Sequence, residues 1–189
     1  LRLSQLLGNW LELEKQRQPF TILETERRQT VDLGSIELRI RPDRIDQLAD
    51  GSLALIDYKT GRAKRSMWDG DRPEQPQLLL YLAAAQAVSA IAFGCLKTGE
   101  TGWEIYGEDV PGKFAGNKRK GEPEGGWIDF VQRSREAVDR LTREFRDGFA
   151  AVDPLKGEDT CKYCEQKPFC RIGEAAHIRA GAGDEEGGD

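Results

Sequence analysis

The Asp50-Gly51 pair is the feature of this sequence that most restricts how the chain can fold. Asp-Gly between apolar segments is a strong signal for a tight hairpin turn. Here it separates two segments with strand character, residues 44–48 and 53–58, and the second is apolar enough for a buried strand. The pair therefore predicts two neighbouring antiparallel strands.

The rest of the chain alternates between helical and strand patterns. Helices are predicted where apolar residues recur at helical spacing, over residues 3–17, 74–89 and 127–149. Further strands are predicted from alternation or short apolar runs, over residues 31–33, 36–40, 90–97 and 102–106. The helix at 74–89 links two strands as a crossover, while hairpins supply antiparallel pairs. This order predicts an α/β domain whose central mixed β-sheet is flanked by helices.

Length and composition narrow the class of protein. A chain of 189 residues is expected to form one domain with an appendage. The longest apolar run, Leu78–Ala85, is far short of the roughly 20 residues that a membrane helix needs, and no secretory signal is visible, so we expect a cytoplasmic protein without a membrane partner. His177 is the only histidine, which excludes sites built from several histidines. Because the chain starts at Leu1 and its only methionine is Met67, we expect it to be a piece of a longer polypeptide.

The net charge of −5 does not by itself indicate a nucleic-acid binder. Much of it comes from the Gly-rich tail at 179–189, which we expect to be disordered. Basic residues nevertheless gather in two loops, at Arg62, Lys64 and Arg65 and at Lys113, Lys118, Arg119 and Lys120. Taken alone, such clusters usually form solvated surface.

Two carboxylates and a lysine mark the ends of the predicted hairpin. Asp43 precedes its first strand, and Asp57 and Lys59 end its second. Strand residues two apart share a face, so Asp57 and Lys59 point the same way and Asp43 can join them around one hard cation. Such a group suits metal-assisted hydrolysis of a phosphodiester, in which the lysine offsets developing negative charge. Considered alone, an Asp-x-Lys pair is more often a surface ion pair.

The motifs around these residues resemble a known family. The segments 41–46 and 56–61 resemble motifs II and III of the RecB-like nucleases of the PD-(D/E)xK superfamily. Gln77 and Tyr81 resemble the Q-x-x-x-Y motif of that family, on the helix that follows the catalytic strands. Glu26 resembles its upstream acidic residue, with Glu24 as the rival assignment.

The resemblance implies a restriction-endonuclease-like core over residues 1–155. Asp43, Asp57 and Glu26 would bind Mg²⁺ or Mn²⁺, and Lys59 would be the catalytic lysine. Gln77 and Tyr81 would hold the lysine side of the site or contact DNA. The phosphate backbone would lie on the basic loops, through Arg62, Lys64, Arg65, Lys118, Arg119 and Lys120. Asp46 is expected to pair with Arg44 or Arg41 rather than to bind metal.

The implied function is a metal-dependent DNA nuclease, with exonuclease action favoured. It would be a module of a bacterial repair or recombination protein, joined to a helicase-like region or subunit. The alternative is a catalytically silent scaffold of the same fold that binds DNA or a partner protein. A third interpretation is a zinc-stapled interaction domain in which the carboxylates are incidental.

A cysteine-rich segment at 156–178 carries Cys161, Cys164 and Cys170. Three thiolates at this spacing suit tetrahedral zinc or an iron–sulfur cluster, each of which normally needs four ligands. The segment is similar to the C-terminal cysteines of AddB-type iron–sulfur nucleases. That resemblance implies a [4Fe–4S] cluster whose fourth cysteine lies upstream of Leu1. Cys95, within an apolar run, is expected to be a buried small hydrophobe.

Overall fold

The computed structural model describes residues 2–34, 36–108, 114 and 123–170. The chain divides into two compact units, Leu1–Asp147 and Gly148–Asp189. The first unit ends a few residues before position 155, where the sequence suggested a boundary. The acidic tail and the second basic loop, with Lys113, Lys118, Arg119 and Lys120, lie outside the described residues.

The first unit is built on a five-stranded sheet. Its strands are β1 (Phe20–Thr25), β4 (Arg44–Leu48), β5 (Leu53–Lys59), β6 (Val88–Cys95) and β7 (Gly102–Gly107), in the order β1-β4-β5-β6-β7. Strands β5 and β6 run parallel, and the other neighbours are antiparallel. A separate hairpin joins β2 (Gln29–Asp32) to β3 (Glu37–Ile40). The mixed sheet and the hairpin at Asp50-Gly51 are therefore confirmed, and Gly51 takes the positive φ of 82° that its turn requires.

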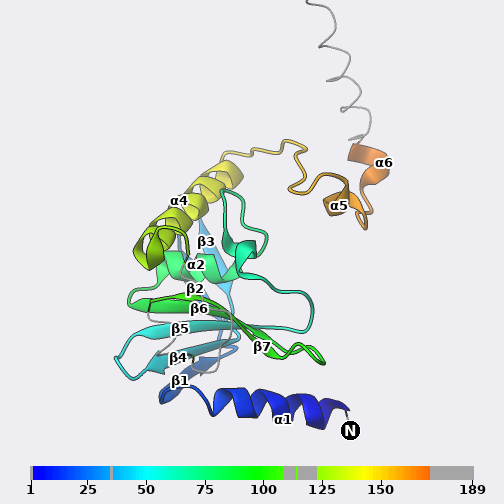
Figure 1. Ribbon diagram of the computed structural model, residues 1–189. Coiled ribbons are helices and arrows are strands. Elements are labelled where there is room, and N and C mark those ends of the chain that lie inside the picture. The colour runs from blue at the N-terminus through cyan, green and yellow to red at the C-terminus, as the bar shows by residue number, and fades with distance from the viewer. Residues whose placement is uncertain (1, 35, 109–113, 115–122, 171–189) are drawn as a thin grey trace, which may run out of the picture. The chain divides into compact units, whose positions relative to one another are not determined.

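Helices cover both faces of this sheet (Figure 1). Helix α1 (Arg2–Glu14) lies on one face, and α2 (Gln77–Ala84) and α4 (Gly126–Arg146) lie on the other. A short 3₁₀ helix, η1 (Arg65–Trp68), occupies the loop after β5 and buries Trp68. The arrangement confirms the predicted crossover, because α2 connects the parallel strands β5 and β6.

The prediction of a helix over residues 74–89 was wrong in length. Pro76 disfavours helical geometry at the residue before it, so the helix starts only at Gln77. At the other end Ala87 has a φ of 58°, and Val88 already pairs with Leu53 in the sheet. Pairing with β5 therefore overrides the helical pattern of this segment.

The two faces of the sheet have separate cores. The face under α2 and α4 buries Trp68 against Phe93, whose rings stack at 4.2 Å. The face under α1 buries Trp10, which contacts Tyr58 edge-on. A Cβ at Gly94 would lie 2.6 Å from a ring carbon of Tyr58, so only glycine lets this ring pack on β6. The Tyr58 side chain thus lies on the face opposite Asp57 and Lys59.

A buried ionic network joins α1 to the sheet on the Tyr58 side. The Asp46 carboxylate is fully buried and accepts hydrogen bonds from Arg44 Nε at 2.6 Å and from Arg17 Nη1 at 2.8 Å. Arg44 also donates to Glu14 at 2.8 Å and to the Tyr58 hydroxyl at 3.0 Å. Burial opposes the charge of Arg44, yet Asp46 holds the pKa of Arg44 above its usual value. The expected pairing of Asp46 with Arg44 is confirmed.

In the second unit, the described residues form two short helices, α5 (Glu158–Cys161) and α6 (Lys167–Cys170). Each spans four residues, and α5 contains no buried residue. Of the helices in the described segments, none has the length and apolar character needed to span a bilayer.

Candidate active site

The ends of β4 and β5 bring Asp43, Asp57 and Lys59 together. Asp43 directly precedes β4, and its Oδ2 accepts a hydrogen bond from the backbone amide of Tyr58 at 2.7 Å. Lys59 Nζ lies 2.7 Å from Asp57 Oδ2, forming an ion pair. The side chain of Asp57 is 5% exposed and that of Lys59 is 24% exposed, so the carboxylate is buried and the ammonium group is partly open to water.

The electrostatics of Asp57 favour an added cation. Burial raises the pKa of Asp57 above its usual 3.8, and the neighbouring charge of Asp43 adds to that rise. Lys59 acts in the opposite direction but does not fully offset burial. A second positive charge beside Asp43 and Asp57 would therefore stabilise the ionised carboxylates.

A β-bulge places Glu24 on the same face of the sheet as Asp57. The pairing of β1 with β4 shifts between Ile22 and Glu24, so that Glu24 lies opposite Ile45. Ile45 in turn pairs with Leu55, which shares a face with Asp57. Without the bulge, Glu24 would lie on the opposite face, because an inserted residue reverses the alternation of side chains.

The two candidate upstream acids therefore have different surroundings. The Glu24 side chain is 21% exposed and accepts a hydrogen bond from Arg27 at 3.0 Å. The Glu26 side chain is 69% exposed and has an ion-pair distance of 3.8 Å to Arg41. The backbone of Glu26 nevertheless lies beside Asp43, since its amide donates to the Asp43 carbonyl at 3.1 Å.

Helix α2 presents Tyr81 and Gln77 to this cluster. Tyr81 is 2% exposed, and its hydroxyl has no hydrogen-bond partner among the described residues. Burial raises the pKa of Tyr81, and the charges of Glu24 and Asp43 raise it further. Gln77 Nε2 donates to the backbone carbonyl of Arg41 at 3.4 Å, which ties α2 to the segment before Asp43.

We expect Tyr81→Phe to separate stability from function. A buried hydroxyl without a partner opposes folding, so its removal should leave the free energy of unfolding unchanged or raise it by about 1 kcal/mol. If the hydroxyl serves the site, nucleic-acid cleavage should fall at the same time. Urea unfolding and a cleavage assay on the same sample test both statements. A variant that is less stable and equally active would show that Tyr81 is only a core residue.

The donor set suits a hard divalent cation. Among the described residues, no three His, Cys, Asp or Glu side chains are spaced to hold a metal ion. Mg²⁺ does not require three, because it is commonly bound through one or two carboxylates with water completing the shell. Asp43 and Asp57 meet that need, and burial, with a smaller contribution from the charge of Asp43, raises the pKa of Asp57, so that an added cation would favour its ionised form.

The cysteines do not form a complete cluster site. Cys161 and Cys170 are partly buried and Cys164 is exposed, and all three are free of disulfides. An iron–sulfur cluster normally needs four ligands, so this segment does not fit one by itself. Cys95 ends β6 opposite Lys59 and packs at the edge of the core, with its Sγ 3.9 Å from the Phe93 carbonyl.

The first basic loop contains two different environments. Arg65 lies over the Tyr106 ring and within 3.6 Å of Glu104, so its side chain already contacts other residues of the protein. Arg62 and Lys64 line an open cavity and have no ion pair with any described residue. Lys97 lines the same cavity, although sequence reasoning did not select it.

Comparison with known proteins decides the family. A model of the PD-(D/E)XK nuclease superfamily matches residues 1–171. The chain belongs to this superfamily. The resemblance seen in the motifs around Asp43 and Asp57 is thereby confirmed.

Two relatives of this nuclease-superfamily chain are subunits of an ATP-dependent helicase/deoxyribonuclease, one from Streptococcus pyogenes serotype M1 and one from serotype M49 (strain NZ131). Each is 34% identical over 89 residues. The matches cover 46% of this chain but only 8% of each relative's length. The solved structure of SSO0001 covers 89% of this chain and 71% of its own, at 18% identity and a TM-score of 0.36. That similarity is too low to support an argument.

Proposed function

We propose that this chain is a metal-dependent deoxyribonuclease that hydrolyses phosphodiester bonds beside Asp43, Asp57 and Lys59. The main observation behind the proposal is the ion pair between Lys59 and the buried Asp57 carboxylate at 2.7 Å, next to a second carboxylate. Membership of the PD-(D/E)XK superfamily supports it. A purely structural ion pair would not need Asp43 held beside it by the Tyr58 amide.

Each residue has a distinct role in this proposal. Asp43 and Asp57 would hold Mg²⁺ or Mn²⁺, and Glu24 is better placed than Glu26 to assist them. The bound cation supplies Lewis-acid stabilisation and lowers the pKa of a coordinated water. Lys59 Nζ stabilises negative charge on the phosphate oxygens while water adds to phosphorus and the bond to the leaving oxygen breaks. The leaving oxygen then takes up a proton and departs as a hydroxyl.

The names of the relatives support a substrate and a partner for this proposal. Their names describe a helicase/deoxyribonuclease subunit, which supports DNA as substrate and a helicase-like region or subunit as partner. Arg62 and Lys64 would contact the phosphate backbone, as would the basic residues at 118–120. An iron–sulfur centre at Cys161, Cys164 and Cys170 remains a prediction for a protein that supplies the fourth ligand.

Cleavage of end-labelled linear DNA tests the proposed activity. Wild-type protein should cut with Mg²⁺ or Mn²⁺ and should not cut with EDTA. Asp57→Asn and Lys59→Ala should each lower the rate by about a thousandfold, equivalent to roughly 4 kcal/mol of transition-state stabilisation. Single- and double-stranded substrates labelled at either end also report polarity and the mode of cutting.

Two variants with substitutions of exposed charged residues show whether loss of any surface charge lowers the rate of cleavage. Asp139→Asn and Lys15→Ala alter exposed ion-paired residues and should leave the rate unchanged. Metal binding without cutting, measured by calorimetry, would favour the silent scaffold. Absence of both metal binding and cutting by folded wild-type protein would overturn the proposal.

A further inference from the structure

The Phe93 ring lies beside Asp57 and Lys59 on the same face of the sheet. Phe93 pairs with Asp57 in the parallel register of β5 and β6, and residues that pair in this way share a face. The Nζ atom of Lys59 lies over the ring, 5.5 Å from its centroid. A cation within about 6 Å of a ring centroid is attracted to the negative face of the ring. Lys59 therefore has two partners of different kinds, a carboxylate and an aromatic ring.

Trp68 holds the Phe93 ring in place. The two rings stack with their centroids 4.2 Å apart and an angle of 29° between their planes. Each residue is 1% exposed, so neither ring can turn without displacing the close-packed core around it. Trp68 belongs to η1, in the loop that follows Lys59, and its ring also lies 5.6 Å from that of Tyr106 on β7. The ring next to Lys59 is therefore fixed from behind.

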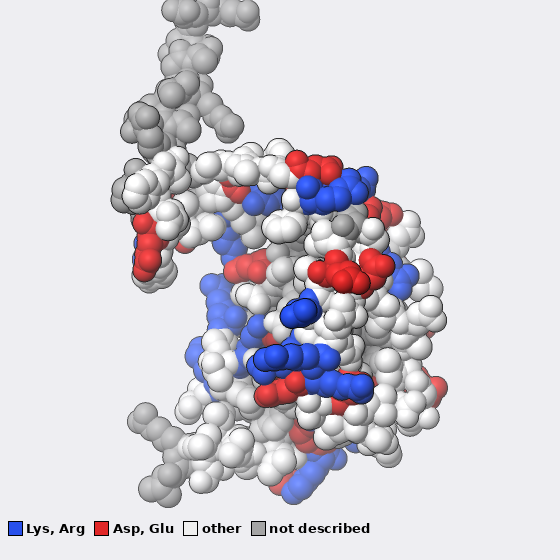
Figure 2. All heavy atoms as spheres, turned by 180° about the vertical axis from the view of Figure 1, so that it is seen from behind, with Lys and Arg blue, Asp and Glu red and all other residues white. Residues whose placement is uncertain are grey.

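Lys59 is more enclosed than a typical surface lysine. Figure 2 shows many Lys and Arg side chains of the first unit at its surface, where they meet water. The Lys59 side chain is only 24% exposed, and its Nζ lies 2.7 Å from the buried Asp57 carboxylate. Holding a lysine in one conformation costs side-chain entropy, and one ionic contact leaves the direction of the ammonium group variable. A second contact, with the Phe93 ring, restricts that direction.

The ring and the carboxylate respond differently to an added cation. In the proposed reaction Asp57 also serves Mg²⁺ or Mn²⁺, and positive charge there repels the ammonium group of Lys59. These hard cations prefer oxygen ligands and leave an aromatic face free. The Phe93 ring therefore continues to attract Lys59 when the Asp57 oxygens are shared with a cation.

We propose that Phe93 is a positioning residue whose ring holds the Lys59 ammonium group at the site of phosphodiester hydrolysis. Trp68 supports this role by keeping the ring fixed. The inference rests on the proposed nuclease function, which it deepens by naming a residue that acts through the proposed catalytic lysine. In this scheme Phe93 contacts neither the substrate nor the reacting atoms.

Nuclear magnetic resonance of the metal-free protein tests the contact without any activity. Protons over the face of an aromatic ring resonate upfield, so the ε-methylene protons of Lys59 should be shifted upfield in wild-type protein labelled with carbon-13 lysine. Lys59→Arg identifies the signal, because it is the one that disappears. Phe93→Leu should abolish the upfield shift. A Lys59 signal that is the same in wild type and Phe93→Leu would overturn the proposal.

Fluorination of Phe93 tests its effect on the reaction. Fluorine atoms weaken the negative face of the ring but nearly keep its size and apolar character. Replacing Phe93 by phenylalanines that carry one, two or three fluorine atoms should lower kcat stepwise, by about fivefold for the third, which corresponds to a contact of roughly 1 kcal/mol. KM should not change, because the ring does not bind substrate. A kcat that is constant across the series would show that the ring is only part of the core and would overturn the proposal.

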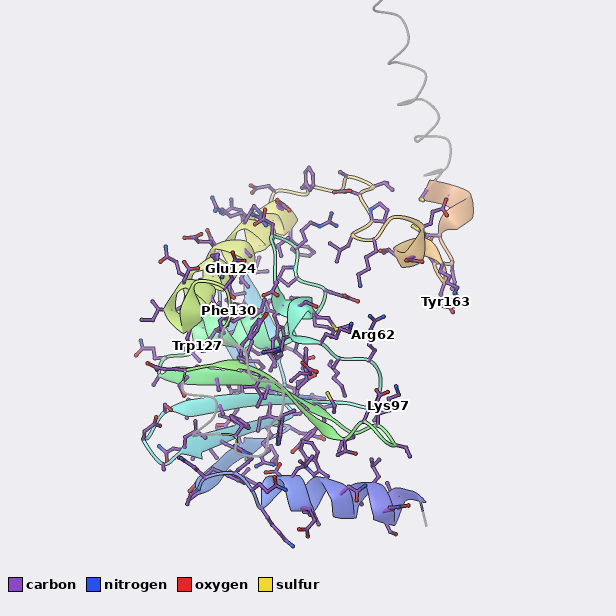
Figure 3. All side chains as sticks on the ribbon, viewed as in Figure 1. Arg62, Lys97, Glu124, Trp127, Phe130 and Tyr163 are labelled. Atoms are coloured by element: carbon purple, nitrogen blue, oxygen red, sulfur yellow. The ribbon has the colours of Figure 1, made fainter. Side chains whose placement is uncertain are left out.

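Phe130→Leu is the matched control. Phe130 is 2% exposed and packs in the same core, with its ring 5.0 Å from Tyr106 and 5.7 Å from Trp127, but it lies on α4 (Figure 3). Phe93→Leu should lower kcat about fivefold, whereas Phe130→Leu should leave kcat of the folded protein unchanged. Equal losses of kcat in the two variants would overturn the proposal. If the Lys59 signal depends on Phe93 but wild-type protein never cuts with metal, the proposed activity fails and the placement of Lys59 by Phe93 stands.

Discussion

Asp46→Ala is expected to destabilise the protein by about 3–5 kcal/mol, because it breaks a buried ion-pair network by removing one member. The variant leaves Glu14 as the only described carboxylate paired with Arg17, whose side chain is fully buried, and with Arg44, which is 7% exposed. Neither guanidinium is exposed enough for water to replace the lost carboxylate fully. The midpoint of thermal unfolding should therefore fall by about 6–20 °C for a chain of this size.

Urea and thermal unfolding followed by circular dichroism measure this effect. Asp139→Ala removes an exposed carboxylate that pairs with Arg143 at 2.7 Å, and it should change stability by no more than about 0.5 kcal/mol. If Asp46→Ala lowered the free energy of unfolding by less than about 1 kcal/mol, the buried network would contribute little to stability. The stability of Asp46→Asn should lie between those of the wild type and Asp46→Ala, because Asn keeps the shape of Asp but loses its charge.

Asp57→Asn is expected to make the metal-free protein more stable at neutral pH, although it removes the proposed activity. Burial and Asp43 raise the pKa of Asp57 in the folded state, and Lys59 only partly opposes them. Between the unfolded and the folded pKa values, the native state binds more protons than the unfolded state. Stability contributed by Asp57 is therefore present at low pH and lost as the pH rises through its folded pKa. Asn carries no such charge.

We would measure the free energy of unfolding of both proteins in EDTA between about pH 3.5 and pH 8, a range that covers carboxyl titration. This measurement shows whether the variant is more or less stable than the wild type at each pH. The variant should gain on the wild type as the pH rises above 3.8 and then keep a constant advantage. Mg²⁺ should stabilise the wild type and leave the variant unchanged, because only a protein that binds the ion gains from it. A variant less stable than the wild type at about pH 7 in EDTA would contradict the assigned environment of Asp57.

Local signals in the sequence were sufficient to predict the hairpin that carries Asp57 and Lys59 of the proposed site. The Asp50-Gly51 turn determines which strands are neighbours, and the two-residue period of a strand places Asp57 and Lys59 on one face. These relations involve residues close in sequence and require no knowledge of distant packing. The superfamily could be predicted from the motifs between Glu26 and Tyr81, and the mixed sheet from the order of helical and strand patterns along the chain.

Tertiary structure alone decided that the Glu24 side chain lies on the same sheet face as Asp57. The bulge before Glu24 reverses the alternation of β1, and nothing in the sequence of that strand signals an inserted residue. Similarly, Pro76 and the pairing of Val88 with β5 shortened α2. The burial of Arg17 against Asp46 and the meeting of Lys97 with Arg62 depend on residues far apart in the chain. Turns and alternation are properties of neighbouring residues, whereas burial and cavity walls arise only when distant segments pack together.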